Sequence, residues 1–468
     1  MGEGGILLAA LDAVAREATL FAALCFLVSG VDDLLIDGIY FLRLIRARWF
    51  GRRCATAAWS PADGEASRER IVVFVAAWDE SRVIGRMLRA ALARFDYPDY
   101  ALYVGTYPND IATIRAVAEV AQSDPRIRLV IGERPGPTTK ADCLNVLWRA
   151  LQRDEAADGR RTAAVVLHDA EDLVHPLELR VFAHHLPRFA AIQIPVMPIA
   201  FPGSPLVSGH YCDEFAEAHA KVMPVRQALR AGLPLAGVGC AIRCDMLARI
   251  ADVRGGAPFD ATSLTEDYEL GLTVRALGGS SLFARVAERP GGPPVAVCAY
   301  FPATLGAAIR QKSRWMTGIA LAGWDRTGWS RAGDLADHWM RMRDRRATLA
   351  MPVLAVAYCT LAIWGASLAG HAIAQGQPPA LPPFLSGLLW VNIALLAWRM
   401  SVRSALVAKV YGWREARWAV PRMVVGNFIA LLAARRAVVL YVRMLGGAIP
   451  DWDKTDHFFP GDTGQAVR

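Results

Sequence analysis

Several features common in small or disordered proteins are absent from this sequence. It holds no CxxC pair, and Cys240 and Cys244 have no second pair or nearby histidine to complete a zinc site. It has no internal repeat or low-complexity tract, and only five of the 52 basic residues are lysine. These absences exclude a disulfide-stapled miniprotein, a zinc module and a disordered chain. We expect all eight cysteines to be reduced, and therefore the soluble part to be cytoplasmic.

Charge is also scarce, and apolar residues are in slight excess. Charged residues make up 21% and apolar residues 54%, with a mean hydropathy of +0.25. Soluble domains typically hold about 25% charged and about 45–50% apolar residues. The 468 residues therefore predict a soluble domain joined to a few membrane helices. Much of the net charge of +8 flanks the apolar segments as arginine, which favours anionic lipid and argues against nucleic acid as a partner.

The first apolar stretch, residues 18–45, crosses a membrane only if three acids are accepted, Asp32, Asp33 and Asp37. Each charge costs about 2.5–3.5 kcal/mol at a bilayer centre. These acids either sit near the interface and pack against other helices, or line a polar path. The positive-inside rule makes the end of this stretch cytoplasmic, because it is followed by Arg43, Arg46, Arg48, Arg52 and Arg53.

Two further spans are predicted at about residues 348–370 and 384–402. A fourth apolar stretch, residues 420–442, contains Pro421 and the pair Arg435–Arg436, so we expect an amphipathic helix in the cytoplasmic interface. This gives three crossings with the C-terminus inside; if the fourth stretch crosses, the C-terminus is outside. The chain then divides into an N-terminal transmembrane region (1–50), a cytoplasmic domain (51–345), transmembrane and interface helices (346–445) and a cytoplasmic tail (446–468).

The cytoplasmic domain alternates strand and helix patterns. Apolar, β-branched runs predict strands within residues 70–80 and at residues 100–106, 126–131 and 163–167. Helical patterns lie between them at residues 81–95, 111–122 and 140–152. This alternation predicts a Rossmann-like α/β fold with a mostly parallel sheet covered on both faces. Ligands of such sheets bind at the carboxyl ends of the strands.

Polar residues follow those strand ends. Asp169 and Glu171 come directly after the fourth strand and adjoin Asp172, a pattern that can hold Mg²⁺ or Mn²⁺ with substrate phosphates. Asp110 follows the second strand, where it can receive a base or ribose hydroxyl, and Lys140 begins a helix, where anions bind favourably. The alternative for each is an ordinary solvated loop residue.

Two later motifs complete the set. Glu266 and Asp267 follow Thr265; they either supply a general base, Asp267, or belong to a helix cap with acids in its first turn. Gln311, Arg314 and Trp315 share one helix face at i, i+3 and i+4, suited to a diphosphate and a sugar ring. A membrane-proximal amphipathic helix is the alternative for this last motif.

In this order, and with Ala77-Trp-Asp-Glu80 before them, the motifs resemble those of membrane-bound family 2 glycosyltransferases. That group contains cellulose, hyaluronan and poly-N-acetylglucosamine synthases. The variants Tyr107-Pro-Asn-Asp110, His168-Asp-Ala-Glu-Asp172 and Trp452-Asp-Lys-Thr-Asp-His457 are most similar to the bacteriophage N4 adsorption protein B branch. The resemblance implies a GT-A-like catalytic domain and a multi-pass protein of the bacterial inner membrane.

The resemblance also implies roles for the motif residues. Those that would bind the nucleotide-sugar donor are Glu80, Asp110, Lys140 and Asp169. Those that would hold Mg²⁺ or Mn²⁺ are Asp169, Glu171 and Asp172. Glu266 and Asp267 form the catalytic motif, with Asp267 as the base. Those that would bind the acceptor sugar and the leaving diphosphate are Gln311, Arg314 and Trp315. The tail supplies either a candidate gating loop or an interface anchor with Trp452, Lys454, Thr455 and His457.

The leading functional hypothesis is therefore an inverting, processive hexosyltransferase. It would extend a growing glycan from a nucleotide-sugar donor, UDP-linked by family precedent, and pass it through the bilayer. Three crossings make a thin channel wall, so either the acceptor passes along few helices, or a homo-oligomer or an outer-membrane export partner completes the path. The alternatives are transfer of one sugar to a polyprenyl phosphate lipid, and a membrane scaffold or phage-uptake component with a vestigial site.

Overall fold

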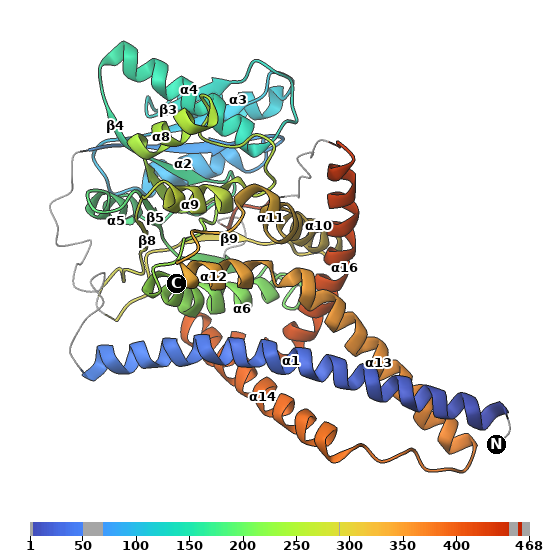
Figure 1. Ribbon diagram of the computed structural model, residues 1–468. Coiled ribbons are helices and arrows are strands. Elements are labelled where there is room, and N and C mark those ends of the chain that lie inside the picture. The colour runs from blue at the N-terminus through green and yellow to red at the C-terminus, as the bar shows by residue number, and fades with distance from the viewer. Residues whose placement is uncertain (1–2, 50–68, 290, 449–456, 461–468) are drawn as a thin grey trace.

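The structure is a computed structural model that describes residues 3–49, 69–289, 291–448 and 457–460. An α/β domain lies above a group of long helices in Figure 1. The strands are β1 (Arg70–Ala76), β2 (Tyr100–Thr106), β3 (Ile127–Ile131), β4 (Thr162–His168), β5 (Ala191–Gln193), β6 (Val196–Ile199), β7 (Cys240–Arg243), β8 (Ser281–Phe283) and β9 (Val297–Tyr300).

The helices of the α/β domain surround these strands. They are α2 (Ile84–Arg94), α3 (Ile111–Ala121), α4 (Lys140–Asp158), α5 (Glu178–His185), α6 (Gly209–Glu217), α7 (Met223–Ala228), α8 (Cys244–Arg254), α9 (Glu266–Ala276), α10 (Leu305–Trp315), α11 (Ala322–Thr327) and α12 (Leu335–Arg345). Two short π-helical turns are η1 (Ala218–Val222) and η2 (Met316–Leu321). The remaining helices are α1 (Glu3–Trp49), α13 (Ala347–Ile373), α14 (Pro383–Tyr411), α15 (Trp413–Ala416) and α16 (Ala419–Leu445).

The main sheet has seven strands in the order β3-β2-β1-β4-β7-β5-β8. Strands β3, β2, β1 and β4 run parallel, whereas β7 is antiparallel to both β4 and β5. Strands β6 and β9 form a separate parallel pair. This mostly parallel sheet confirms the predicted fold class. Because β1, β2 and β4 end at one edge, the motifs that follow them in the sequence gather there.

Apolar cores lie on both faces of the sheet. Ile71, Val73 and Val75 of β1 pack with residues of α2, α3 and α5, whereas Val72 and Phe74 pack with α4, α8 and α9. Strands buried on both faces read as continuous apolar runs, which is why the sequence pattern revealed them. The predicted helix at residues 140–152 continues to Asp158, where it ends at Gly159 in the left-handed conformation.

The acids of α1 dock the membrane helices onto the α/β domain. This helix has 47 residues, about 70 Å at about 1.5 Å per residue, which is more than twice the hydrocarbon thickness of about 30 Å. Asp33 pairs with Arg346 at 2.8 Å and with Arg399 at 3.2 Å. Asp37 pairs with Lys221 of η1 at 2.6 Å. These contacts support the interpretation of the acids as helix-packing residues rather than as the lining of a polar path.

Four helices in the described part of the chain are long and apolar enough to cross a membrane: α1, α13, α14 and α16. Helix α16 packs against the α/β domain, where it lies beside α10 (Figure 1). Near its start, buried Arg422 pairs with Asp213 at 3.0 Å and donates to the Pro205 carbonyl at 2.7 Å. Beyond its end, His457 lies 2.8 Å from Glu80. Both flanks of α16 thus contact the α/β domain, which supports the interface placement; that placement stays a prediction.

A reporter fusion tests this placement. Green fluorescent protein fused after Arg468 is expected to fluoresce in bacterial cells, because the segment after α16 returns to the side of the α/β domain. The same reporter fused after Gly376, between α13 and α14, is expected to stay dark, and alkaline phosphatase fused there to be active. A dark fusion at Arg468 together with an active phosphatase at that position contradicts the interface placement.

Candidate active site

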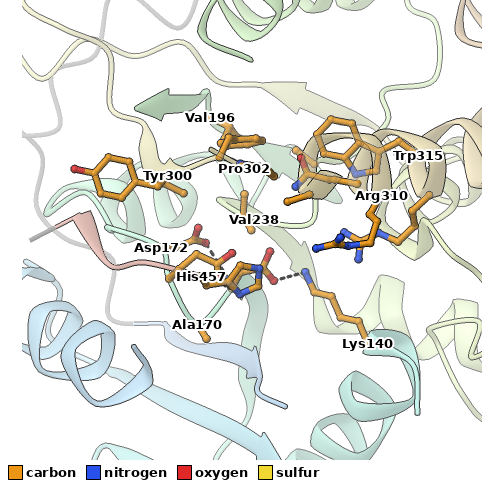
Figure 2. A pocket seen from close by; sticks show the side chains of 18 of the residues that line it. Lys140, Ala170, Asp172, Val196, Val238, Tyr300, Pro302, Arg310, Trp315 and His457 are labelled. Atoms are coloured by element: carbon orange, nitrogen blue, oxygen red, sulfur yellow. Dashed lines mark hydrogen bonds and ion pairs between the residues drawn. The ribbon is translucent and has the colours of Figure 1, made fainter. Parts of the chain in front are cut away.

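A cavity of about 330 Å³ lies where the predicted motifs meet. Its walls come from the segments after β1 and β4, from the first turns of α4 and α9, and from α10. Figure 2 shows Lys140, Arg310 and His457 converging on it from elements far apart in the sequence. The predicted residues that line the cavity are Glu80, Lys140, Asp169, Glu171, Asp172, Glu266, Asp267, Gln311, Arg314, Trp315 and His457.

The turn after β4 gives its three acids different surroundings. Asp169 Oδ1 accepts a hydrogen bond from Lys140 Nζ at 2.5 Å. Asp172 Oδ2 accepts from the Asp169 backbone N–H at 2.9 Å and lies 2.8 Å from His168 Nδ1. Glu171 Oε2 is buried and accepts no hydrogen bond from the described part of the chain. Burial raises the pKa of Glu171 to about 8, against the opposing effect of the nearby His457. Glu171 is therefore the acid of this turn whose carboxylate is not held by a hydrogen bond at Oε2, and its ion-pair partner is His457.

Glu171 belongs to a group that fits a divalent cation. One ligand atom each from Glu80, Glu171 and His457 lies within 4.8 Å of the other two. His457 Nδ1 is 2.8 Å from Glu80 Oε1 and 3.3 Å from Glu171 Oε2. Burial lowers the pKa of His457, but the two carboxylates outweigh it and raise that pKa to about 9. Carboxylate and neutral imidazole are ligands that Mn²⁺ accepts, so a bound cation would take the place of the proton on His457, and Mg²⁺ prefers the carboxylates.

This group differs from the predicted metal set. It shares Glu171 with that set and adds Glu80 and His457, which come from the opposite ends of the sequence. Asp169 is held by Lys140, and one oxygen of Asp172 is held by His168 and the backbone. Metal-binding roles for Asp169 and Asp172 stay predictions.

Lys140 connects the β4 turn with the start of α9. Besides Asp169, its ammonium group donates to the Gly237 carbonyl at 3.3 Å. Burial by itself lowers the pKa of Lys140, but Asp169 and Glu266 raise it above the ordinary lysine value. Lys140 therefore remains a cation inside the cavity, where it offsets part of the negative charge.

Asp267 stands in the first turn of α9, where the backbone passes close to it. Gly237 has φ of +72°, and a Cβ there would lie 2.8 Å from Asp267 Oδ2, so only glycine fits. Burial and the neighbouring Glu266 raise the pKa of Asp267 to about 7, while Lys140 opposes this shift. Thr265 makes no side-chain cap hydrogen bond. Thr265 nevertheless occupies the N-cap position, and Glu266 and Asp267 lie in the first turn, so both the base and the helix-cap interpretations stay predictions.

One face of α10 carries the predicted acceptor residues into the cavity. Gln311, Arg314 and Trp315 all line it. Gln311 Oε1 is buried without a hydrogen-bond partner among the described residues, which leaves it an acceptor without a donor. On another face, buried Lys312 donates to Glu214 of α6 at 2.5 Å and fixes the helix. The amphipathic pattern of α10 thus arises from burial within the α/β domain and not only from nearness to a membrane.

Some lining residues were not predicted. Phe201 lies against Tyr300 and Phe458, with ring centroids 5.2 and 5.1 Å apart, and all three residues line the cavity. Arg310 also lines it, one residue before the predicted Gln311 motif (Figure 2). In the sequence, the aromatic pair Tyr300-Phe301 shortly before α10 was the feature that could have indicated an aromatic wall of the cavity.

Other predicted residues are not brought into the cavity by the described structure. Asp110 caps α3: Oδ1 accepts from Thr113 N–H at 3.2 Å and Oδ2 from Asp79 N–H at 2.6 Å. Asp110 is not among the lining residues, and its donor-binding role stays a prediction. Of the candidate gating loop, His457 is described, whereas three members lie outside the described residues: Trp452, Lys454 and Thr455.

Comparisons with known proteins agree with this geometry. The family described as "Glycosyltransferase like family 2" matches residues 68–318. The bacteriophage adsorption protein B of Escherichia coli K12 is 35% identical over 473 aligned residues, covering 94% of this chain and 62% of that protein. The bacteriophage N4 adsorption protein B of Escherichia coli O157:H7 matches with the same values. The chain thus spans 62% of the length of these relatives.

Among solved structures, a mannosyltransferase of Pyrobaculum calidifontis in complex with GDP-mannose and Mn²⁺ is 19% identical, with a TM-score of 0.49. That comparison covers 92% of this chain and 99% of the other. The family match covers the sheet, the Gln311 motif and the residues that line the cavity except His457 and Phe458. The chain therefore belongs to glycosyltransferase family 2, in agreement with the resemblance seen in its motifs.

Proposed function

We propose that the protein is an inverting, processive glycosyltransferase that extends a glycan from a nucleotide-sugar donor. The observation that carries this proposal is that one cavity contains the candidate base Asp267, the candidate cation group and the Gln311 motif. Direct displacement at a sugar carbon needs a base for the acceptor hydroxyl, positive charge for the leaving group and a fixed acceptor. The lining residues supply all three.

The donor side contains the acids after β1 and β4. A divalent cation held by Glu80, Glu171 and His457 would offset charge on the departing nucleoside diphosphate. Lys140 and Arg314 also line the cavity and would contact the diphosphate as permanent cations. By family precedent the nucleotide is UDP, and either Mg²⁺ or Mn²⁺ would serve.

The acceptor side is supplied by α10. Trp315 offers a flat apolar face for a sugar ring, and it is supported by Phe301 with ring centroids 6.4 Å apart. Gln311 Oε1, buried without a donor among the described residues, would accept a hydrogen bond from a sugar hydroxyl. Asp267 would then take the proton of the attacking hydroxyl, because its raised pKa keeps it a stronger base than an ordinary aspartate.

Passage of a product through the bilayer is part of the proposal, with the α/β domain and the C-terminus on the cytoplasmic side of a bacterial inner membrane. Polar groups between the membrane helices already engage one another: Trp364 donates to Thr19 at 2.8 Å, and Asn392 donates to the Ala23 carbonyl at 3.0 Å. Such pairing occupies groups that a glycan would otherwise contact. We therefore expect a second copy of the chain, or an outer-membrane export partner, to complete the path.

The names of the two relatives support a second candidate, a membrane component used for phage adsorption. The two roles are compatible, because an envelope protein that makes or exports a glycan also determines what a phage finds at the cell surface. A vestigial site would need no buried base beside a cation group, so the geometry favours an active transferase.

The pH dependence of activity tests the base. Because the pKa of Asp267 is about 7, kcat/KM is expected to fall about tenfold per pH unit well below that value and to level off above it. Asp267→Asn removes the base and is expected to lower kcat about 10²- to 10⁴-fold. Both are measured as sugar transfer by detergent-solubilised protein across a pH series.

The control for this series is Asp252→Asn, an exposed acid on α8, which is expected to keep the wild-type profile. Full polymer synthesis by Asp267→Asn, or an unchanged acidic limb in that variant, contradicts the assignment of the base.

The product identifies the reaction. Inverted vesicles given radiolabelled UDP-sugars with Mg²⁺ or Mn²⁺ are expected to form long polysaccharide. Label extracted into organic solvent would instead indicate transfer to a polyprenyl phosphate, and no incorporation from several donors would favour the phage-component role alone.

Replacement of Trp315 should separate elongation from donor hydrolysis. Trp315→Ala is expected to lower elongation about tenfold, as the loss of about 1.4 kcal/mol of binding does, while donor hydrolysis changes less. Trp413, exposed on α15, provides the matched control in Trp413→Ala. Equal losses of elongation and hydrolysis would argue against an acceptor role for Trp315.

A further inference from the structure

A histidine outside the predicted set lies beneath the acids of the β4 turn. His168 is the last residue of β4 and is fully buried. Its Nδ1 lies 2.8 Å from Asp172 Oδ2, and its Nε2 lies 2.6 Å from Glu178 Oε1. Ionised carboxylates only accept hydrogen bonds, so with both acids ionised both ring nitrogens donate and the ring is an imidazolium.

The two acids held by His168 fix the backbone of the turn at both ends. Asp172 Oδ2 also accepts from the Asp169 backbone N–H at 2.9 Å, at the start of the turn. Glu178 Oε2 accepts from the His175 backbone N–H at 3.1 Å, at its other end. The imidazolium thus joins β4, the turn and the start of α5 into one hydrogen-bonded unit.

A separate contact fixes the middle of this segment. The Leu173 backbone N–H donates to the Cys298 carbonyl at 2.8 Å, and the Cys298 N–H donates back at 3.1 Å. This bridge holds Leu173 against β9 independently of His168. The part of the turn that depends on His168 through Asp172 is therefore the stretch from Asp169 to Glu171, which faces the cavity.

We propose that His168 is a positioning residue that sets Glu171 in the cation group by holding Asp172. It touches neither donor nor acceptor, and it acts through the turn rather than at the reacting atoms. Partners that orient the ligands of a metal typically change metal affinity about 10- to 100-fold when they are replaced. This inference rests on the proposed cation group and goes beyond the proposed function by naming what orients it.

Two substitutions at this one position separate the two hydrogen bonds of the ring. An asparagine amide nitrogen falls near the position of Nδ1, so His168→Asn keeps the side-chain donor to Asp172 and loses the one to Glu178 Oε1. A glutamine amide nitrogen falls near Nε2, so His168→Gln keeps the side-chain donor to Glu178 and loses the one to Asp172. Both substitutions disturb the buried charges to a comparable degree. Only His168→Gln, which loses the hydrogen bond to Asp172, releases the stretch from Asp169 to Glu171.

The measurement is direct binding of Mn²⁺ to the detergent-solubilised full chain, followed by the electron paramagnetic resonance of free Mn²⁺. His168→Gln is expected to raise the dissociation constant about 10- to 100-fold, and His168→Asn to raise it much less. His185→Asn, at another buried histidine on α5 outside this network, is the matched control and is expected to bind as wild type. Glu171→Gln is expected to weaken binding strongly.

Equal binding by His168→Gln and wild type overturns the proposal, as does an equal loss in His168→Asn and His168→Gln. If His168→Gln does not fold, Asp172→Ala replaces it: this variant removes the oxygen that accepts from both His168 Nδ1 and the Asp169 N–H, and unchanged Mn²⁺ binding by this folded variant overturns the proposal. Absence of Mn²⁺ binding by wild type overturns the cation group and this inference together. Normal Mn²⁺ binding without sugar transfer by wild type contradicts the proposed function alone.

Discussion

The structure depends on how it places negative charge where water solvates it only in part. The carboxylates of Asp169, Glu171 and Glu266 line one cavity, and burial of an uncompensated charge costs several kcal/mol. Each acid therefore has a nearby cation or a raised pKa: Lys140 holds Asp169, and His457 lies beside Glu171. A cavity arranged in this way favours a multiply charged ligand with a cation over a neutral one.

The same constraint explains why elements distant in the sequence must meet. Glu171 follows β4, whereas His457 comes from the end of the chain, and the two meet only because the chain passes α16 and returns to the α/β domain. A close contact between backbone and side chain also joins two of these elements. Gly318 of η2, which continues α10, lies against the side chain of Thr265, where a larger residue would not fit. The Gln311 motif and the turn that bears Asp267 are thereby held in one fixed relation.

Charge also joins the membrane helices to the catalytic domain. Buried pairs such as Asp37 with Lys221 and Arg422 with Asp213 link α1 and α16 to helices of the α/β domain. Removal of one partner of a buried pair typically costs about 3–5 kcal/mol, so these contacts resist separation of the two parts. The hydropathy pattern identified α16 as apolar, but it did not show that Arg422 lies against the domain, because a pattern along one helix does not reveal its neighbours.

The sequence alone predicted β1 to β4, the order of the motifs and the family, but not β5 to β9. Apolar runs such as residues 70–76 and 163–167 must be buried on both faces, and the polar residues after them must gather at one sheet edge. The hydrogen-bond and ion-pair partners of these residues became known only from the folded structure. It placed Asp110 as a helix cap, set His457 beside Glu80, and showed His168 between two acids. The physical reason is that periodicity records which face of an element is buried, whereas hydrogen bonds and ion pairs depend on distances between elements that no local pattern encodes.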